Sequence, residues 1–263
     1  MLVKTSSLGW WAVAVFFGGI LGATAVGVGV VAVGADGFEP ISFALVFVGQ
    51  AGASLFLVFV FSKRLGSGSL AADVGLVARG SDWWALLAGM GLQIGVAIVT
   101  YPLLQLMFPD GPPEQGVAGI AGDSETTLEI ILILVSAAVL APLIEEIIFR
   151  GMFLPWAHRF VAKWPAILIS AAVFSIIHPI LDWDARGAAP GIFLLGVVLG
   201  WAAFRRGDLS LAIPLHSGVN LLAGILILWG DDILDWAERQ SEGLDQAEAL
   251  LNGVIAVAHA LGL

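Results

Sequence analysis

The chain has 263 residues, of which 59% are hydrophobic and 12% charged, and its formal net charge is −10. A soluble domain carries about a quarter charged residues, so this composition excludes an ordinary soluble protein and indicates a membrane protein. The chain has no cysteine, which excludes disulfides, thiolate catalysis and Cys-ligated zinc. It also has no basic cluster, so nucleic acid is not an expected partner.

Apolar runs long enough to cross a bilayer follow one another along the chain. Runs of about 20 apolar residues indicate spanning helices. We expect seven, at about residues 8–33, 41–61, 82–108, 127–160, 165–181, 190–204 and 209–229. The first is nearly twice as long as the apolar region of a cleaved signal peptide, so we expect it to be retained. Residues 247–263 form a shorter run, which either spans the membrane or lies along its surface. The sequence thus predicts an all-α polytopic membrane bundle of seven to eight helices.

Lysine and arginine predict the orientation of this bundle. If the spans alternate, eight basic residues fall on one side, namely Lys4, Lys63, Arg64, Arg79, Arg159, Lys163, Arg205 and Arg206. Only Arg186 and Arg239 fall on the other side. Basic residues concentrate in cytoplasmic loops, so we expect a plasma-membrane protein with a cytoplasmic N-terminus.

Three of the predicted spans carry ionisable or amide side chains. The fourth contains Glu145, Glu146 and Arg150, the fifth contains His178, and the seventh contains His216 and Asn220. A charge at membrane depth costs on the order of 3 kcal/mol or more, so such side chains face one another or a hydrated cavity and usually mark function. We therefore expect these three spans to share one site.

The spacing within the fourth span suggests two different glutamates. Glu146 and Arg150 are four residues apart on one helical face and suit an ion pair. Glu145 is rotated by about 100° from Glu146, so it has no local partner. A carboxyl group in that position can act as a general base or acid. The structural alternative is that all three side chains only hold helices together.

Other polar and small residues within the spans are expected to serve packing. Glycine pairs at four-residue spacing let helix backbones approach closely, and they occur at Gly18 and Gly22, Gly91 and Gly95, and Gly196 and Gly200. Gln50 and Gln93 are expected to form hydrogen bonds between helices.

Three motifs, EExxxR at Glu145, FxxxH ending at His178 and HxxxN beginning at His216, occur in this order on three apolar spans. The set resembles the CPBP intramembrane protease family, which includes type II CAAX prenyl endopeptidases and bacteriocin-processing and immunity proteins. The resemblance covers about residues 127–230, which would form the catalytic core. Residues 1–126 would supply the first three spans, and residues 231–263 an acidic connector and a C-terminal apolar segment.

The resemblance implies an intramembrane endopeptidase. Glu145 and His178 would activate a water molecule, and His216 and Asn220 would stabilise the oxyanion. The pair Glu146 and Arg150 completes the motif. The partners would be the lipid bilayer and a peptide or protein substrate, by analogy membrane-associated or prenylated.

The resemblance leaves the cofactor open. A metal-free glutamate mechanism is favoured, so no cofactor is expected. The alternative is zinc, held by Glu145, His178 and His216 with an open fourth position.

Two other functions compete with the protease. One is a non-enzymatic scaffold or immunity-type protein that keeps the polar cluster for stability. The other is a proton-coupled transporter, which would use the same group as a relay. The two halves of the chain do not repeat one another with Gly- or Pro-broken helices, which argues against a transporter.

Overall fold

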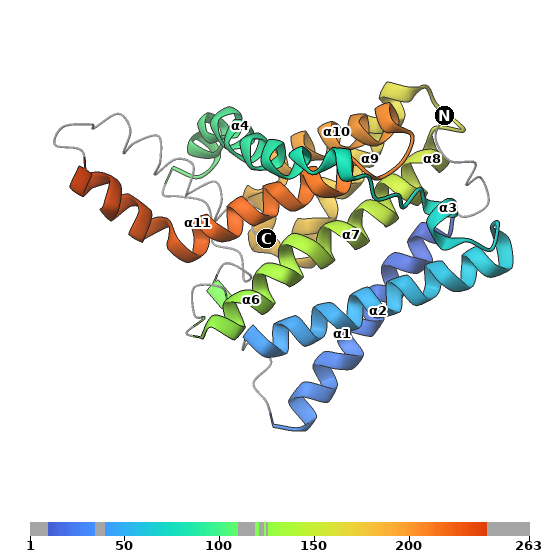
Figure 1. Cartoon of the computed structure of the whole chain (residues 1–263), viewed down its shortest axis with the longest axis horizontal. Helices are drawn as coiled ribbons and strands as arrows, with labels where there is room; N and C mark the ends of the chain where they lie inside the picture. Colours follow the sequence, from blue (N-terminus) through green and yellow to red (C-terminus); the bar gives the residue numbers. More distant parts are fainter. Residues whose placement is uncertain (1–9, 35–39, 110–118, 121–123, 125, 241–263) are drawn as a thin grey trace.

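The structure is a computed structural model that describes residues 10–34, 40–109, 119–120, 124 and 126–240 (Figure 1). All regular elements in this part of the chain are helical. They are α1 (Trp11–Ala32), α2 (Pro40–Leu65), α3 (Leu70–Val74), η1 (Gly80–Asp82), α4 (Trp84–Met107), α6 (Thr127–Val135), η2 (Ser136–Leu140), α7 (Ala141–Glu145), η3 (Glu146–Phe153), α8 (Leu154–Ala157), α9 (Lys163–Leu181), η4 (Trp183–Gly187), α10 (Ala189–Arg206) and α11 (Ala212–Gln240). Within the described residues, seven helical stretches are long and apolar enough to cross a membrane. The predicted all-α membrane bundle is confirmed.

The ends of the predicted elements differ in places from the structure. The short helices α3 and η4 were not predicted. Helix α11 continues to Gln240, so the stretch expected to begin an acidic connector at residue 231 is at first helical. The apolar segment 247–263 lies outside the described residues.

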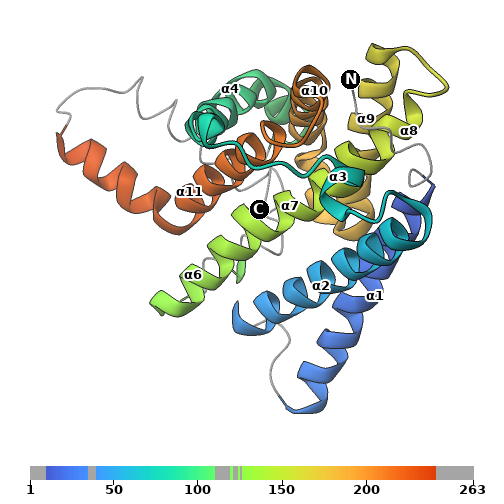
Figure 2. The ribbon, with the colours of Figure 1, turned by 45° about the vertical axis from the view of Figure 1, so that its right-hand side comes forward.

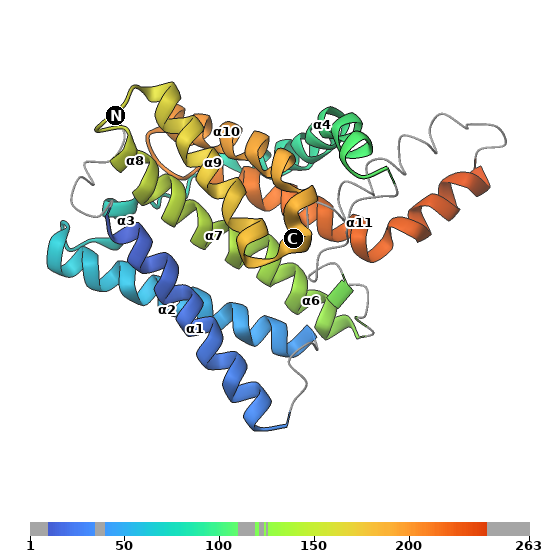
Figure 3. The same cartoon turned by 180° about the vertical axis from the view of Figure 1, so that it is seen from behind.

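The helices form three pairs around one central helix. Helices α1 and α2 pack together, as do α4 with α11 and α9 with α10 (Figures 1 and 2). The continuous helical stretch Thr127–Ala157 runs between these pairs and contacts members of each, and Figure 3 shows it from the side of α9 and α10. This central helix carries both glutamates of the predicted site, so elements from all three pairs can reach them.

Two π-helical segments interrupt the central helix. The stretch is α-helical up to Val135, π-helical in η2, α-helical in α7 and π-helical again in η3. Glu145 ends α7 and Glu146 begins η3. The prediction that the fourth span continues past Arg150 is confirmed, whereas the interruptions were not predicted. Segments of π-helix are rare in proteins, and those that occur often lie at functional sites. Their presence marks this part of the helix as a candidate site.

Close helix contacts involve two of the three predicted glycine pairs. A Cβ atom added at Gly18 or Gly22 would lie within 2.5 Å of atoms of α2, and one at Gly196 within 3.0 Å of α9. The prediction for Gly91 and Gly95 is wrong, since a Cβ atom there would meet nothing within 4 Å. The close approach on α4 lies on another face, at Gly89.

Replacing Gly89 with alanine is expected to lower the free energy of unfolding by about 1–3 kcal/mol, because overpacking forces backbone shifts. The added Cβ atom would lie 2.1 Å from the carbonyl oxygen of Leu215, and one at Gly218 would lie 2.0 Å from that of Leu86. Gly91→Ala on the same helix is the control, and should be neutral or stabilising by up to about 1 kcal/mol. Denaturant unfolding in detergent compares the two variants. Equal stability would contradict the crossing of α4 and α11.

Ion pairs fix the starts of α4 and α11 relative to α10. Asp82 pairs with Arg206 and accepts a hydrogen bond from the Ser210 hydroxyl group, with an O···O distance of 2.9 Å. Arg79 pairs with Asp208. Burial raises the pKa of Asp208, but hydrogen bonds from Ser210 and Arg79 outweigh it, so this pKa lies below its ordinary value. These contacts lie about two turns before His216 and fix the start of α11.

Candidate active site

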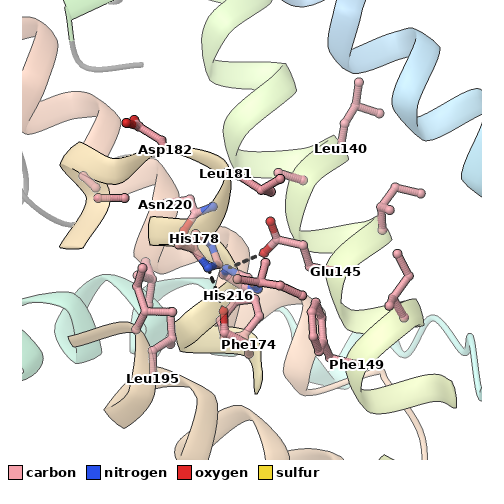
Figure 4. A pocket seen from close by; sticks show the side chains of 18 of the residues that line it. Leu140, Glu145, Phe149, Phe174, His178, Leu181, Asp182, Leu195, His216 and Asn220 are labelled. Carbon is pink, nitrogen blue, oxygen red and sulfur yellow. Dashed lines mark hydrogen bonds and ion pairs between the residues drawn. The ribbon is translucent and has the colours of Figure 1, made fainter. Parts of the chain in front are cut away.

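A cavity of about 290 Å³ lies between the central helix and its neighbours. Apolar side chains from α1, α2, α9 and α10 form much of its wall. Its polar residues include four of the predicted site residues, namely Glu145, His178, His216 and Asn220, which Figure 4 shows close together. The three motif-bearing spans therefore meet at one cavity, as expected from the sequence.

Glu146 lies behind the cavity wall in a buried network. Its Oε1 atom accepts a hydrogen bond from Arg150 Nη1 at 2.9 Å, and lies 3.0 Å from His216 Nδ1. Arg150 Nη2 also donates to the Gly196 carbonyl oxygen at 3.3 Å, which links the network to α10. The predicted ion pair is confirmed. The sequence did not reveal that the same carboxylate also holds His216.

Glu145 lines the cavity instead of joining this network. Its side chain is 28% exposed, whereas that of Glu146 is fully buried. Its Oε2 atom lies 3.6 Å from His216 Nε2, and the dashed line in Figure 4 marks this contact. The neighbouring glutamates thus contact opposite nitrogens of one imidazole ring. Glu145 has one oxygen free of this contact, facing a cavity that can admit water.

His178 is oriented by its own helix. Its Nδ1 atom lies 2.8 Å from the backbone carbonyl oxygen of Phe174, which can only accept, so Nδ1 carries the proton. The rings of Phe174 and His178 are in edge contact, with centroids 4.9 Å apart. Phe174 also supports the Arg150 guanidinium group, whose carbon lies 4.3 Å from the ring centroid. His178 therefore has Nε2 left for a water molecule or substrate.

Asn220 is fixed by a backbone carbonyl group in the first π segment. Its Nδ2 atom donates to the Ala137 carbonyl oxygen at 2.9 Å. In the π-helical pattern, Ala141 N–H bonds to Ser136, and the next donor would belong to Pro142, which has no N–H. The proline thus frees the carbonyl group that Asn220 binds. One amide hydrogen and the carbonyl oxygen of Asn220 remain available at the cavity.

The described residues offer no preformed zinc site. Among the described residues, no group of three or more histidine, aspartate and glutamate side chains is arranged to hold a metal ion. We therefore derive no step through a metal.

The motif-bearing part of the chain also matches a known family. Residues 127–222 match the family model described as type II CAAX prenyl endopeptidase Rce1-like. The match includes all six predicted site residues and confirms the resemblance expected from their motifs. The Rce1-like description is that of a protease family, and the described residues include seven helices that are long and apolar enough to cross a membrane.

One curated protein is similar to this chain over a stretch of 85 residues. The UPF0177 protein YbdI of Lactococcus lactis subsp. lactis (strain IL1403) is 33% identical over 85 residues, which are 32% of this chain and 42% of the relative. The match thus spans less than half of that relative. No solved structure matches the chain.

Two polar residues of the cavity wall, Gln50 and Gln93, were predicted from the sequence to serve packing rather than the site. Gln93 was expected to form hydrogen bonds between helices, yet neither polar atom of its buried amide has a partner in the described part of the chain. The sequence signal that identified the histidines also applies to Gln93, because a polar side chain within a spanning helix needs a hydrogen-bond partner.

Proposed function

We propose that this protein is an intramembrane endopeptidase that hydrolyses peptide bonds with a water molecule activated by Glu145 and His178. The observation that carries the proposal is the meeting of Glu145, His178, His216 and Asn220 on one cavity. The Rce1-like match over residues 127–222 supports the same reaction class.

In this mechanism, two acceptors hold the attacking water. Glu145 takes one of its protons, and His178 Nε2 accepts a hydrogen bond from the other hydrogen. The hydroxide adds to the carbonyl carbon of the scissile bond, and the C–N bond of the tetrahedral intermediate then breaks. Glu145 returns its proton to the leaving amine. A carboxyl group that serves first as base and then as acid is a familiar form of general acid–base catalysis.

His216 and Asn220 would stabilise the oxyanion. The free amide hydrogen of Asn220 is one donor, and His216 would supply another through an N–H group at Nε2, which now lies 3.6 Å from Glu145 Oε2. Donors fixed before the reaction are effective because they need no reorganisation in a site of low dielectric constant. Glu146 holds His216 by a contact with its Nδ1 atom, and the Ala137 carbonyl group holds Asn220.

The substrate would be a peptide or protein that reaches the cavity within the membrane, by analogy with the family a membrane-associated or prenylated one. The bias of basic residues favours a cytoplasmic N-terminus in the plasma membrane. Seated in the bilayer, the protein would meet its substrate from lipid or from the cytoplasmic surface.

Replacing His178 with alanine is expected to abolish cleavage while leaving the fold intact, because among the described residues the imidazole bonds only to its own helix. The measurement is mass spectrometry of a peptide library incubated with purified protein in liposomes. His158→Ala is the control, since His158 lies near the end of α8 and does not line the cavity. Wild-type protein that cleaves nothing, or a His178→Ala variant as active as wild type, would refute the proposal. A scaffold would show no cleavage to lose.

A further inference from the structure

The cavity wall contains a buried amide that the proposed mechanism does not use. Gln93 lies on α4, lines the cavity and has no exposed surface. Neither its Nε2 nor its Oε1 atom has a hydrogen-bond partner within the described residues. Among the glutamines that the structure describes, Gln93 alone has both amide atoms buried without a hydrogen-bond partner.

Gln93 lies at the level of the proposed oxyanion site. Helices α4 and α11 run parallel, because Asp82 contacts Ser210 at their starts and Gly89 packs against Gly218 further along. Gln93 is one turn beyond Gly89, which places it beside the turn of α11 that carries Asn220. A substrate whose scissile carbonyl group lies near Asn220 would pass the side chain of Gln93, whose two amide atoms are covered in the free protein and would be uncovered by a small side-chain movement.

The amide of Gln93 forms no hydrogen bond with any of the residues that the structure describes. A buried polar group without a partner destabilises a protein, and an amide can donate two hydrogen bonds and accept two. An apolar residue of the same shape would serve packing between α4 and α11 better. The amide therefore suits a partner that is absent from the free protein and supplies both a donor and an acceptor.

We propose that Gln93 binds the main chain of the substrate, accepting from the N–H and donating to the C=O of a peptide unit beside the scissile bond. The ligand class rests on the proposed function, since a peptidase must hold a peptide chain here. A peptide unit offers a donor and an acceptor at fixed spacing whatever its side chains are. Gln93 is thus a substrate-binding residue, and it restricts the ligand to chains with a backbone amide.

The test measures binding without cleavage. The full-length Glu145→Gln protein in detergent is titrated against a dansyl-labelled hexapeptide of alternating leucine and alanine, followed by fluorescence anisotropy. Adding Gln93→Met is expected to weaken binding about tenfold, as for the loss of hydrogen bonds in a buried site. Analogues in which one backbone amide at a time is an ester provide the second measurement. One ester position should weaken binding about tenfold with Gln93 present, and by no more than about twofold with Gln93→Met.

Gln105→Met is the matched control, because Gln105 lies on the same helix, is exposed and bonds to Tyr101. It should leave peptide binding unchanged. Gln93→Met should also unfold at the same temperature as its parent or a higher one. A lower unfolding temperature would indicate a structural amide and overturn the inference. So would unchanged binding by Gln93→Met, equal tolerance of every ester, or no saturable binding of the hexapeptide.

These outcomes are separate from those of the proposed function. If the wild-type protein cleaves no peptide but binding still depends on Gln93, hydrolysis is refuted and the main-chain contact stands. If cleavage is present and Gln93→Met leaves KM, kcat and peptide binding unchanged, the mechanism stands and the role of Gln93 is refuted.

Discussion

Replacing Glu145 with glutamine is expected to slow peptide cleavage by about 10²- to 10⁴-fold, the range associated with loss of a general acid–base group. Glutamine has nearly the same size but cannot take a proton from water. Glu145 is partly exposed at the cavity and lies outside the buried network, so the variant should fold as the wild type does. The measurement is the initial rate of cleavage of a peptide found in the library, at matched protein concentrations.

Glu129→Gln is the control for this substitution. Glu129 lies on the same continuous helix and forms a capping box with Thr126, in which glutamine is an accepted substitute. It should therefore keep wild-type activity. A Glu145→Gln variant that cleaves at the wild-type rate would remove Glu145 as the base, and the unfolding temperatures of the three proteins would show that folding did not decide the result.

Much of the fold can be predicted from the sequence, because a bilayer admits few arrangements of an apolar chain. Runs of about 20 apolar residues must be helical to satisfy their backbone groups. The six polar site residues stand out for the same reason, since an ionisable side chain in such a run needs a partner. The spacing of Glu146 and Arg150 also predicts their ion pair, because residues four apart share one helical face.

The contacts between helices are harder to predict from the sequence. It did not show that Glu146 and Glu145 contact opposite nitrogens of His216, because this contact depends on how α11 meets the central helix. The tight crossing at Gly89 was missed because both Gly89 and Gly91 are small, and only packing decides which one faces α11. The π segments were also missed, although Pro142, which lacks an N–H group next to the first segment, is visible in the sequence.

Replacing Arg150 with methionine is expected to lower the free energy of unfolding by about 3–5 kcal/mol, because it leaves the Glu146 carboxylate buried without its cationic partner. Both side chains are fully buried, and Arg150 also binds the Gly196 carbonyl group. Arg186→Met is the control, since its pair with Asp184 is largely exposed and should contribute less than about 1 kcal/mol. Denaturant unfolding in detergent compares the two variants, and similar losses would contradict the assigned role of the buried pair.

A double variant separates the stability of this network from its effect on the site. Replacing Glu146 with leucine and Arg150 with methionine removes both charges, and a buried ion pair exchanged for apolar residues is often neutral or stabilising by about 1–4 kcal/mol. We expect stability to return towards that of the wild type, while cleavage is lost because His216 Nδ1 has no carboxylate to orient it. Cleavage at the wild-type rate by a stable double variant would show that Glu146 does not position His216. Loss of cleavage despite restored stability would mean that the charged pair serves the reaction rather than the fold.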